Sequence, residues 1–362
     1  MFRLPPGLGF PAAPTSRTGV TFPTGLTFPT GLTLAAAMAL ASCEFQPIPD
    51  EDEPASQVPA PDFTLGTENT HNRWSATIPP QLTVPSGSVV EVWTKEASDG
   101  QITESTVVDD LADIDFGLIH ALTGPIQVEG ASPGDLLAVT VHDVQVEGWG
   151  WATILPGFGF LADEFTEPWI RGFPMESGAT EVAFDENITI PLDPFAGVMG
   201  VAPATDSMLV TIPPRANGGN MDNRYMKTGA TVYFPVQVEG ALFSVGDAHA
   251  AQGDGEVSGT AIEAPMRLVL EIEVMENTRG IVEPQYETDD YYAVTGFATT
   301  IDEAARKATR YMIDYLVAEH GLTRNEAYVL CSLAGDLKIS ETVDVPHMLV
   351  SMHMPKGIFG AQ

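Results

Sequence analysis

The chain has 362 residues, of which 49 are acidic and only 16 are Lys or Arg, so its formal net charge at pH 7 is −33. Such a charge repels nucleic acid and anionic lipid headgroups, which excludes proteins that bind either one through a basic surface. Hydrophobic residues make up 44% of the sequence, enough for a large buried core.

The first 43 residues have the pattern of an export signal. Arg3 and Arg17 are the only charges before an apolar run at 32–41, which is too short to span a bilayer. The run ends in Leu40-Ala-Ser-Cys43, which resembles the lipobox of bacterial lipoproteins; the alternative is a coincidental Ala-Ser-Cys in an apolar leader. We therefore expect residues 1–43 to be a lipoprotein-type signal peptide. The exported protein would contact the membrane only through a lipid on Cys43, at the periplasmic or extracellular face of the cell envelope.

Residues 44–62 are rich in Pro, Glu and Asp and have little to bury, so we interpret them as a disordered tether. The folded domain is expected to occupy residues 63–362. Cys331 is the only cysteine after Cys43, so the mature protein can form no intramolecular disulfide.

Short apolar runs bounded by Pro and Gly follow, and their spacing is typical of β-sandwich or barrel-like sheets. The segment 149–174 is aromatic and Gly-rich without a clear period, so we expect a long loop there. The predicted strands are 81–84, 89–93, 136–141, 187–190, 208–212, 230–235 and 267–274.

Helix signals are concentrated near the C-terminus. Thr300 and Glu303 have capping-box spacing, apolar residues then recur at helical spacing, and Gly321 is the expected stop. Thr323 and Glu326 open a second helix that runs to about Leu333, followed by a strand at 337–343. The predicted fold class is therefore α+β, mostly β, with sandwich or barrel-like sheets and a late helical pair.

The stretch 217–263 gathers acidic and imidazole side chains among glycines. Asp247 and His249 are two residues apart, so on an extended backbone both point to the same side. The glycines around them allow turns that return the next carboxylates, Asp254 and Glu256, toward that side, and Asp222 lies earlier in the same stretch. Oxygen and nitrogen ligands gathered in this way suit a divalent metal, whose bound water becomes a nucleophile near neutral pH. A structural calcium loop or a solvated turn is the alternative interpretation.

The same stretch carries a family resemblance. G-G-N-M-D at 218–222 and P-V-x-V-x-G-A-L-F-S-V-G-D-x-H-A-A-Q-G-D-G-E at 235–256 resemble the acetamidase/formamidase family of metal-dependent hydrolases of small aliphatic amides. Further family-like pieces are H-N-R-W at 71–74, L-T-G-P-I-Q-V-E-G-A-S-P-G-D at 122–135 and G-W-G-W at 148–151. The resemblance extends from His71 to about the C-terminus and implies that residues 63–362 form a catalytic domain of this kind.

Within this resemblance, Asp222, Asp247 and His249 are the expected metal ligands. His71, in the family-like H-N-R-W, is expected to be a further ligand or a substrate contact. Zinc is favoured, with calcium, manganese and iron as alternatives, because mixed carboxylate and imidazole ligands suit all four. Glu256 is predicted to carry protons, since a carboxylate beside a metal and apolar walls titrates high enough to accept and then donate one.

Other side chains are assigned to substrate binding. Asn220 is expected to orient the substrate through its amide, and His120 either lines the same pocket or supports a ligand. Trp149 and Trp151 either wall a small apolar pocket or belong to the core. Asp254 is interpreted as a turn residue. In the strand 136–141 and just beyond it, Asp143 is expected to point inward in preference to His142.

Three hypotheses about function remain. The first is an exported, lipid-anchored amidohydrolase of a small linear amide or compact lactam, with the amide as its only small-molecule partner and homo-oligomeric assembly. The second is a lipid-anchored binding protein for small amides or cations without turnover, and the third is a calcium-stabilised surface protein. A cysteine nucleophile is disfavoured because Cys331 lies on the apolar face of a predicted helix. Glu256 beside His249 favours the hydrolase, since a binding protein needs no proton carrier.

Overall fold

The computed structural model describes residues 58–360, and the account below is restricted to them. The predicted signal peptide with Cys43, and most of the predicted tether, lie outside these residues. Asp62, the last residue of the predicted tether, already pairs with the folded domain: its N–H donates to Val89 O at 2.8 Å and its carboxylate accepts from the Val89 N–H at 3.0 Å. Within the described part of the chain, no helix is long and apolar enough to cross a membrane.

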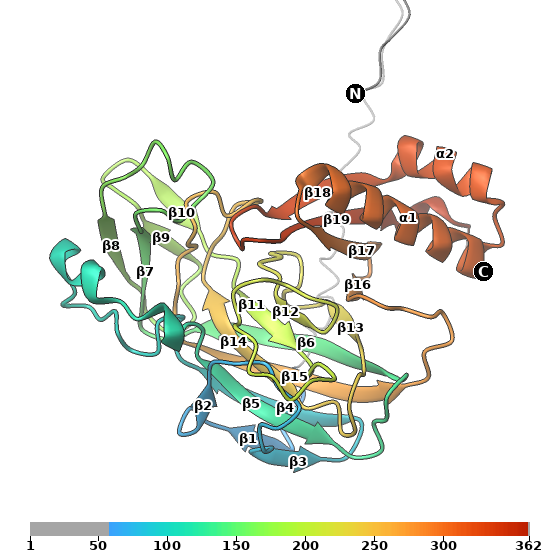
Figure 1. Ribbon diagram of the computed structural model, residues 1–362, viewed down its shortest axis with the longest axis horizontal. Coiled ribbons are helices and arrows are strands. Elements are labelled where there is room, and N and C mark those ends of the chain that lie inside the picture. The colour runs from blue at the N-terminus through green and yellow to red at the C-terminus, as the bar shows by residue number, and fades with distance from the viewer. Residues whose placement is uncertain (1–57, 361–362) are drawn as a thin grey trace, which may run out of the picture. The chain divides into compact units, whose positions relative to one another are not determined.

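Two large β-sheets form the centre of the domain (Figure 1). The first has nine strands in the order β1 (Phe63–Leu65), β4 (Ser88–Thr94), β15 (Met266–Met275), β6 (Leu136–Val146), β13 (Thr231–Pro235), β16 (Gln285–Glu287), β17 (Tyr291–Ala298), β19 (Met348–Pro355) and β18 (Asp336–Glu341). The second has the order β12 (Gly218–Asn220), β11 (Phe195–Gly200), β14 (Phe243–His249), β5 (Leu122–Val128) and β2 (Thr70–His71), with β3 (Leu82–Val84) parallel to β5.

The main hydrophobic core lies between these two sheets. Val139 and Leu268 from the nine-stranded sheet and Ile126 and Val245 from the second sheet are fully buried in one continuous cluster. Along β15, Leu268, Leu270 and Ile272 all belong to this cluster, so the sequence pattern of period two places them on one face. The sheets are open, and this confirms the predicted sandwich, in a mostly β fold of the α+β class, instead of a closed barrel.

The helical pair is confirmed. Helix α1 (Ile301–His320) begins at Thr300, whose side chain accepts a hydrogen bond from the Glu303 N–H, and ends at Gly321 in the left-handed conformation. Helix α2 (Arg324–Ala334) begins with a complete capping box between Thr323 and Glu326. The buried faces of both helices pack on β17 and β19 through a second cluster that includes Met312, Leu316 and the free thiol of Cys331.

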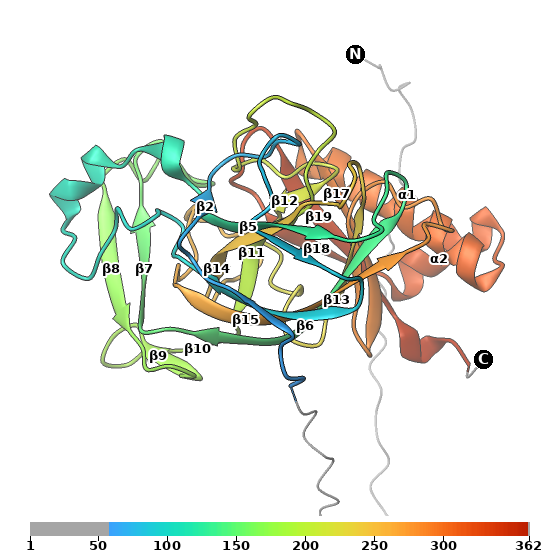
Figure 2. The ribbon, with the colours of Figure 1, turned by 90° about the horizontal axis from the view of Figure 1, so that it is seen from below.

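The expected loop at 149–174 is wrong. Its ends form an antiparallel hairpin of β7 (Trp149–Ile154) and β8 (Trp169–Pro174), because the aromatic and β-branched residues at each end pair along a two-stranded ladder. Only the connection between these strands is irregular. In Figures 1 and 2 this hairpin and the helical pair lie at opposite ends of the domain. A smaller hairpin, β9 (Glu181–Ala183) and β10 (Thr189–Pro191), follows it.

The expected strand at 208–212 is also wrong. Only Leu209 pairs, in an isolated bridge with Trp74, and Pro213 and Pro214 then remove the backbone donors that a longer ladder would need. Three short 3₁₀ helices complete the described secondary structure: η1 (Val108–Asp113), η2 (Phe116–Leu118) and η3 (Lys356–Ile358).

Candidate functional site

The site is built around the end of strand β14. Asp247 and His249 lie on this strand between β11 and β5, and both are buried, with exposed fractions of 3% and 1%. Asp247 has a φ of 50°, so its backbone departs from the extended strand, yet His249 Nε2 still lies 3.6 Å from Asp247 Oδ1. The sequence argument correctly placed the two side chains together.

Backbone strain is concentrated at this site. Asp222, Asp247 and Glu256 are three of the six non-glycine residues with a positive φ in the described chain. A positive φ is uncommon outside glycine, and such residues persist where the surrounding structure holds them for a function. All three carboxylates line the same cavity.

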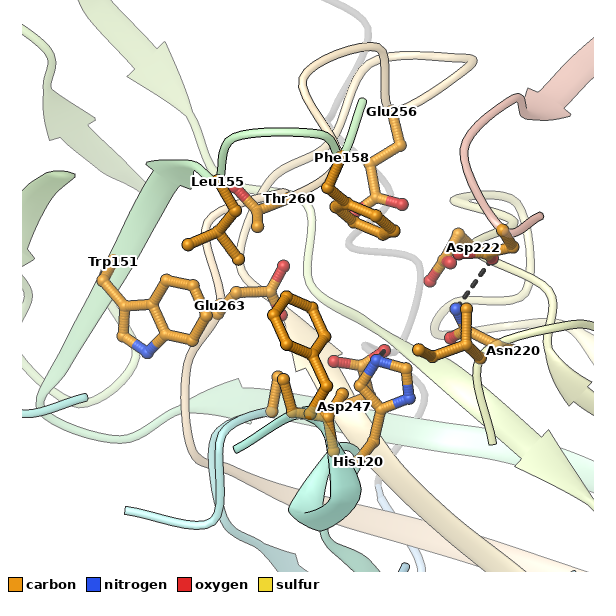
Figure 3. Close-up of a pocket in the computed structure, with 16 residues that line it drawn as sticks. His120, Trp151, Leu155, Phe158, Asn220, Asp222, Asp247, Glu256, Thr260 and Glu263 are labelled. Atoms are coloured by element: carbon orange, nitrogen blue, oxygen red, sulfur yellow. Dashed lines mark hydrogen bonds and ion pairs between the residues drawn. The ribbon is translucent and has the colours of Figure 1, made fainter. Parts of the chain in front are cut away.

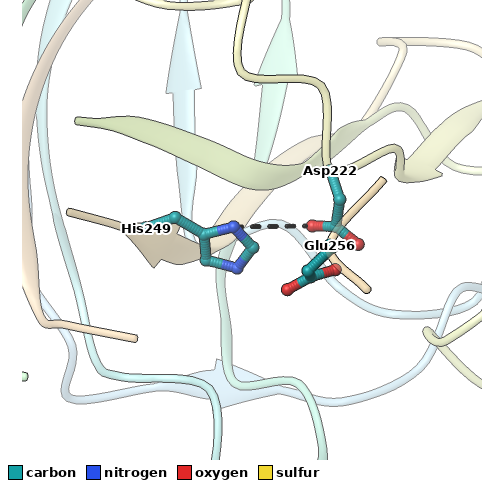
Figure 4. Close-up of side chains that lie close together, drawn as sticks. All are labelled: Asp222, His249 and Glu256. Atoms are coloured by element: carbon teal, nitrogen blue, oxygen red, sulfur yellow. Dashed lines mark ion pairs between the residues drawn. The ribbon is translucent and has the colours of Figure 1, made fainter. Parts of the chain in front are cut away.

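Five side chains make up what we call the carboxylate–histidine cluster: Asp222, Asp247, His249, Glu256 and Glu263. His249 Nε2 lies 3.1 Å from Glu263 Oε2, and its Nδ1 lies 3.7 Å from Asp222 Oδ1. Asp222, His249 and Glu256 together have ligand atoms within 4.8 Å of one another (Figure 4), as do Asp247, His249 and Glu263. All five residues are buried.

Gln252 fixes the orientation of the His249 ring. Its amide nitrogen donates to Asp222 O at 2.7 Å, so its amide oxygen accepts from His249 Nδ1, also at 2.7 Å. His249 Nε2 then faces the carboxylates and has no hydrogen-bond partner. A histidine whose Nδ1 is held in this way is prepared to bind a metal through Nε2.

Burial and crowding perturb the protonation of the cluster. Burial raises the pKa of Glu263 to about 7, and burial followed by the Asp222 charge raises the pKa of Glu256 well above its ordinary value. Burial alone would lower the pKa of His249, but the carboxylates of Glu263 and Asp247 raise it well above 6.5. Burial would also raise the pKa of Asp247, but His120 and His249 hold it at about 2. The field at His249 Nε2 is therefore one that attracts positive charge.

These residues fit a divalent cation. Asp222 Oδ1, His249 Nε2 and Glu263 Oε2 are buried without hydrogen-bond partners, and buried polar atoms are normally satisfied by protein, water or an ion. Unpaired buried carboxylates cost several kcal/mol each, and a cation bound among them removes that cost. One imidazole with several carboxylates suits zinc, manganese or iron, and the oxygen atoms also suit calcium.

A small cavity of about 40 Å³ opens beside the cluster (Figure 3). Asp222, Asp247, Glu256 and Glu263 line it, together with two of the predicted substrate contacts, His120 and Asn220. Apolar side chains complete the lining and include Trp151, which lies beside Glu263 in Figure 3. Charged and apolar side chains therefore line the same cavity, which has space for only a few non-hydrogen atoms.

The contacts of His120 and Asn220 orient them into this cavity. His120 Nε2 lies 3.6 Å from Asp247 Oδ2, and its Nδ1 is buried without a partner. Asn220 Nδ2 donates to Asp344 Oδ2 at 2.7 Å, which leaves Asn220 Oδ1 unpaired. An unpaired amide oxygen on the wall of a cavity is ready to accept a hydrogen bond from an N–H of a ligand.

Two other predicted residues lie elsewhere. His71 is held by protein partners at both ring nitrogens: Nδ1 bonds Arg73 O at 2.8 Å and Nε2 bonds Ser244 Oγ at 2.9 Å. It lines neither the cavity nor the carboxylate–histidine cluster. Trp149 is half-buried against the hydrophobic cluster that includes Ile102 and Trp151, but it does not itself line the cavity.

The prediction that Asp143 points inward is wrong. The pairing of β6 with β15 shifts register between Asp143 and Val141, so His142 is skipped and both residues stand at the half-buried surface. His142 Nε2 contacts Glu271 at 2.9 Å, and Asp143 accepts from Arg267 at 3.0 Å. Asp254 is exposed in its turn and accepts from the Tyr225 hydroxyl at 3.0 Å.

Sequence reasoning missed Glu263 and Asp344. Glu263 follows the Gly-rich loop and returns to His249 through an isolated bridge, and its Oε1 accepts from the Ala261 N–H. Asp344 lies in the loop between β18 and β19, and burial and the Asp222 charge raise its pKa well above the ordinary value. Glu263 lies inside the stretch 217–263, so its acidic side chain could have been recognised as a candidate. No feature of the sequence around Asp344 pointed to the site.

One sequence match to a serine-hydrolase elbow has no support in the structure. Gly130-Ala-Ser132-Pro-Gly134 has the letters G-x-S-x-G, but Ser132 is exposed in the turn between β5 and β6. Its hydroxyl donates to Glu239 at 3.2 Å, and a nucleophile elbow would instead join a strand to a helix.

Gly197 on β11 leaves room for the cluster. An added Cβ would lie 2.4 Å from Asp222 Oδ1 and 2.7 Å from His249 Cε1. We expect Gly197→Ala to displace both side chains, with loss of bound metal and about 1–3 kcal/mol of stability. Gly172→Ala on β8 is the matched control, since nothing lies within 4 Å of its added Cβ. Metal content and thermal unfolding measured on both variants test this; equal metal content in the two would contradict it.

Comparison with known proteins adds to this geometry. The model of the acetamidase/formamidase family matches residues 62–210 and 206–361. The acetamidase of Mycolicibacterium smegmatis is 33% identical over 253 residues, which cover 52% of this chain and 61% of that protein, so the chain spans less than two thirds of this relative. The formamidase of Methylophilus methylotrophus is 28% identical over 365 residues, covering 80% of this chain and 89% of its own.

Solved structures show the same similarity. The crystal structure of an acetamidase from Bacillus halodurans has a TM-score of 0.77 at 34% identity and covers 82% of this chain and 98% of its own. A gamma lactamase from Delftia acidovorans has a TM-score of 0.59 at 25% identity and covers 83% of this chain and 94% of its own. The similarity therefore includes nearly the whole described domain.

Proposed function

Because the chain belongs to the acetamidase/formamidase family of amidohydrolases, we propose that it hydrolyses the carbon–nitrogen bond of a small aliphatic amide, releasing ammonia and a carboxylate. The observation that carries this is the cavity, where the unpaired oxygens Asn220 Oδ1 and Asp222 Oδ1 lie together with further buried acids and apolar side chains. A lactam of similar size would release an amino acid instead of ammonia.

Asp222, Asp247, His249 and Glu263 would hold the divalent metal, with zinc favoured for its preference for imidazole. When bound, the metal would polarise the carbonyl oxygen of the amide and lower the pKa of a water molecule. His120 would support Asp247 from the side away from His249. Gln252 would keep His249 Nε2 directed at the cluster.

The proton transfers are assigned to Glu256 and the orientation of the substrate to Asn220. Asn220 Oδ1 would accept from the NH₂ group of the amide, because Asn220 Nδ2 is already engaged by Asp344. A carboxylate oxygen of Glu256 would take the proton from the attacking water and pass it to the departing nitrogen. The raised pKa of Glu256, caused by burial and Asp222, matches a group that holds a proton between the two steps.

The test combines metal analysis with turnover. We expect the purified protein to contain divalent metal and to release ammonia from formamide, acetamide or propionamide. Removal of the metal by a chelator should lower turnover at least about a hundredfold, and added zinc, manganese, iron or calcium should restore it. A protein that binds metal and amides but releases no ammonia would be the binding protein, and the proposed hydrolysis would be wrong.

We also propose that the protein is exported and lipid-anchored through Cys43, on the basis of the apolar run that ends in Leu40-Ala-Ser-Cys43. Expressed in a bacterium that processes lipoproteins, the wild type should partition with membranes, and Cys43→Ser should shift it to the soluble fraction. Cys331→Ser, a change in the buried face of α2, is the matched control and should leave the partition unchanged. Wild-type protein found in the cytoplasm with its leader intact would contradict the proposal.

A further inference from the structure

The apolar wall of the cavity is formed by segments far apart in the sequence. Trp151 and Leu155 come from β7 and the turn after it, Phe158 from the connection to β8, and Phe116 and Ile119 from η2 and its end. In Figure 3, Phe158 and Leu155 lie on the side of the cavity opposite His120 and Asp247. A ligand whose polar group contacts His120 or Asp247 therefore directs its other end toward Phe158 and Leu155.

Two phenylalanines meet on this side of the cavity. The Phe116 and Phe158 rings are 6.3 Å apart in an edge-to-face arrangement, which is the geometry that aromatic pairs prefer. Phe116 is 45% exposed, so the pair lies where the cavity meets solvent. The two rings thus stand at the apolar end of the site, at its boundary with water.

The loop that carries Phe158 is fastened to the loop that carries Glu256. The Phe160 N–H donates to Val257 O at 2.9 Å, and Thr260 Oγ1 accepts from the Thr153 N–H at 3.0 Å. The Phe158 ring lies against Gly259, where an added Cβ would be 2.5 Å from Phe158 Cδ1. These contacts hold Phe158 in place and prevent a longer substrate from displacing it easily.

The size of the cavity sets the size of the substrate. A cavity needs about 10–15 Å³ in this measure to hold one water, so about 40 Å³ holds three or four non-hydrogen atoms. With its NH₂ group at Asn220 Oδ1, an amide of that size has only a hydrogen or a methyl group to place against the apolar side chains.

We propose that Phe116 and Phe158 close the acyl end of the substrate site and restrict the enzyme to amides with acyl chains of about one or two carbons. This rests on the proposed function of the same site and adds the residues that determine its specificity. Neither phenylalanine belongs to the carboxylate–histidine cluster, and neither takes part in the proton transfer assigned to Glu256. Their removal should therefore change which amide is hydrolysed more than how it is hydrolysed.

The experiment compares formamide with hexanamide in the full-length metal-loaded protein. Phe158→Ala should raise the ratio of kcat/KM for hexanamide to that for formamide about 10- to 200-fold, the range for a methylene-scale change in an apolar pocket. The gain should appear mainly as a lower KM for hexanamide, with metal content unchanged. Phe116→Ala, at an exposed side chain that folding does not require, should give a change in the same direction.

Phe160→Ala is the matched control, because Phe160 lies in the same loop and is 51% exposed but does not line the cavity. The ratio of kcat/KM for hexanamide to that for formamide in this variant should stay within about threefold of the wild-type ratio. If Phe158→Ala does not fold, the hexanamide-to-formamide ratio measured for Phe116→Ala tests the proposal instead. If wild type hydrolyses short amides and neither phenylalanine variant shifts the ratio, the specificity assignment is wrong while the proposed function stands. If wild type hydrolyses no short amide, the proposed function itself fails.

Discussion

His249→Ala is expected to lose bound metal and amide turnover together. His249 is the only histidine of the carboxylate–histidine cluster, and its Nε2 lies within 3.6 Å of both Asp247 and Glu263. Its removal takes away the nitrogen ligand and leaves the buried acids to take up protons instead. Because even outer-shell partners of a metal typically contribute 10–100-fold to affinity, loss of the ligand itself should exceed that range. Asp247→Ala should have the same effect.

Metal content and ammonia release measured on the same samples test this expectation. His142→Ala is the matched control, since His142 pairs with Glu271 on the half-buried face of β6, away from the cluster. Gln252→Ala is expected to give an intermediate loss of bound metal and turnover, because His249 then keeps its lone pair but not its fixed ring orientation. Full turnover in His249→Ala would show that the site lies elsewhere.

The predictable parts of the fold were those set by local sequence. Capping residues Thr300 and Thr323 and the stop at Gly321 gave both helices with nearly correct ends. Period-two patterns predicted six strands of the two large sheets, because alternate side chains must face the core between the sheets; these strands are β3, β4, β6, β13, β15 and β18. The failures were at 149–174, where aromatic residues and glycines hid a real hairpin, and at 208–212, where prolines ended a strand that the pattern favoured.

The site was predictable only within one stretch of sequence. Asp247 and His249 are two apart, so their proximity follows from the strand that bears them. Asp344 lies roughly a hundred residues after Asp247 in the chain and Phe116 still further before it, yet both line the cavity, and no local pattern reports such convergence. His71 shows the converse limit: a family-like motif made it an expected metal ligand or substrate contact, but on β2 Ser244 and Arg73 engage both of its ring nitrogens.

The largest purely catalytic effect is expected for Glu256→Gln. The substitution keeps the shape of the side chain and removes its ability to accept a proton. We expect the fold and the bound metal to be retained while turnover falls by two to four orders of magnitude, roughly the scale of general acid–base catalysis. Glu256 suits this role because it is buried on the cavity wall and burial, reinforced by Asp222, raises its pKa far above the ordinary value.

Asp254→Asn is the matched control for Glu256→Gln, because it neutralises an exposed carboxylate two residues away in the same loop and should leave turnover nearly unchanged. The decisive measurement compares the metal content of Glu256→Gln with that of His249→Ala. A carboxylate oxygen of Glu256 lies within 4.8 Å of ligand atoms of Asp222 and His249. A role of Glu256 as a metal ligand therefore predicts a different metal content for Glu256→Gln. If Glu256→Gln loses metal as completely as His249→Ala, Glu256 is a ligand and the proton must be carried by another group on the cavity wall, of which Asp344 and His120 are the nearest titratable candidates.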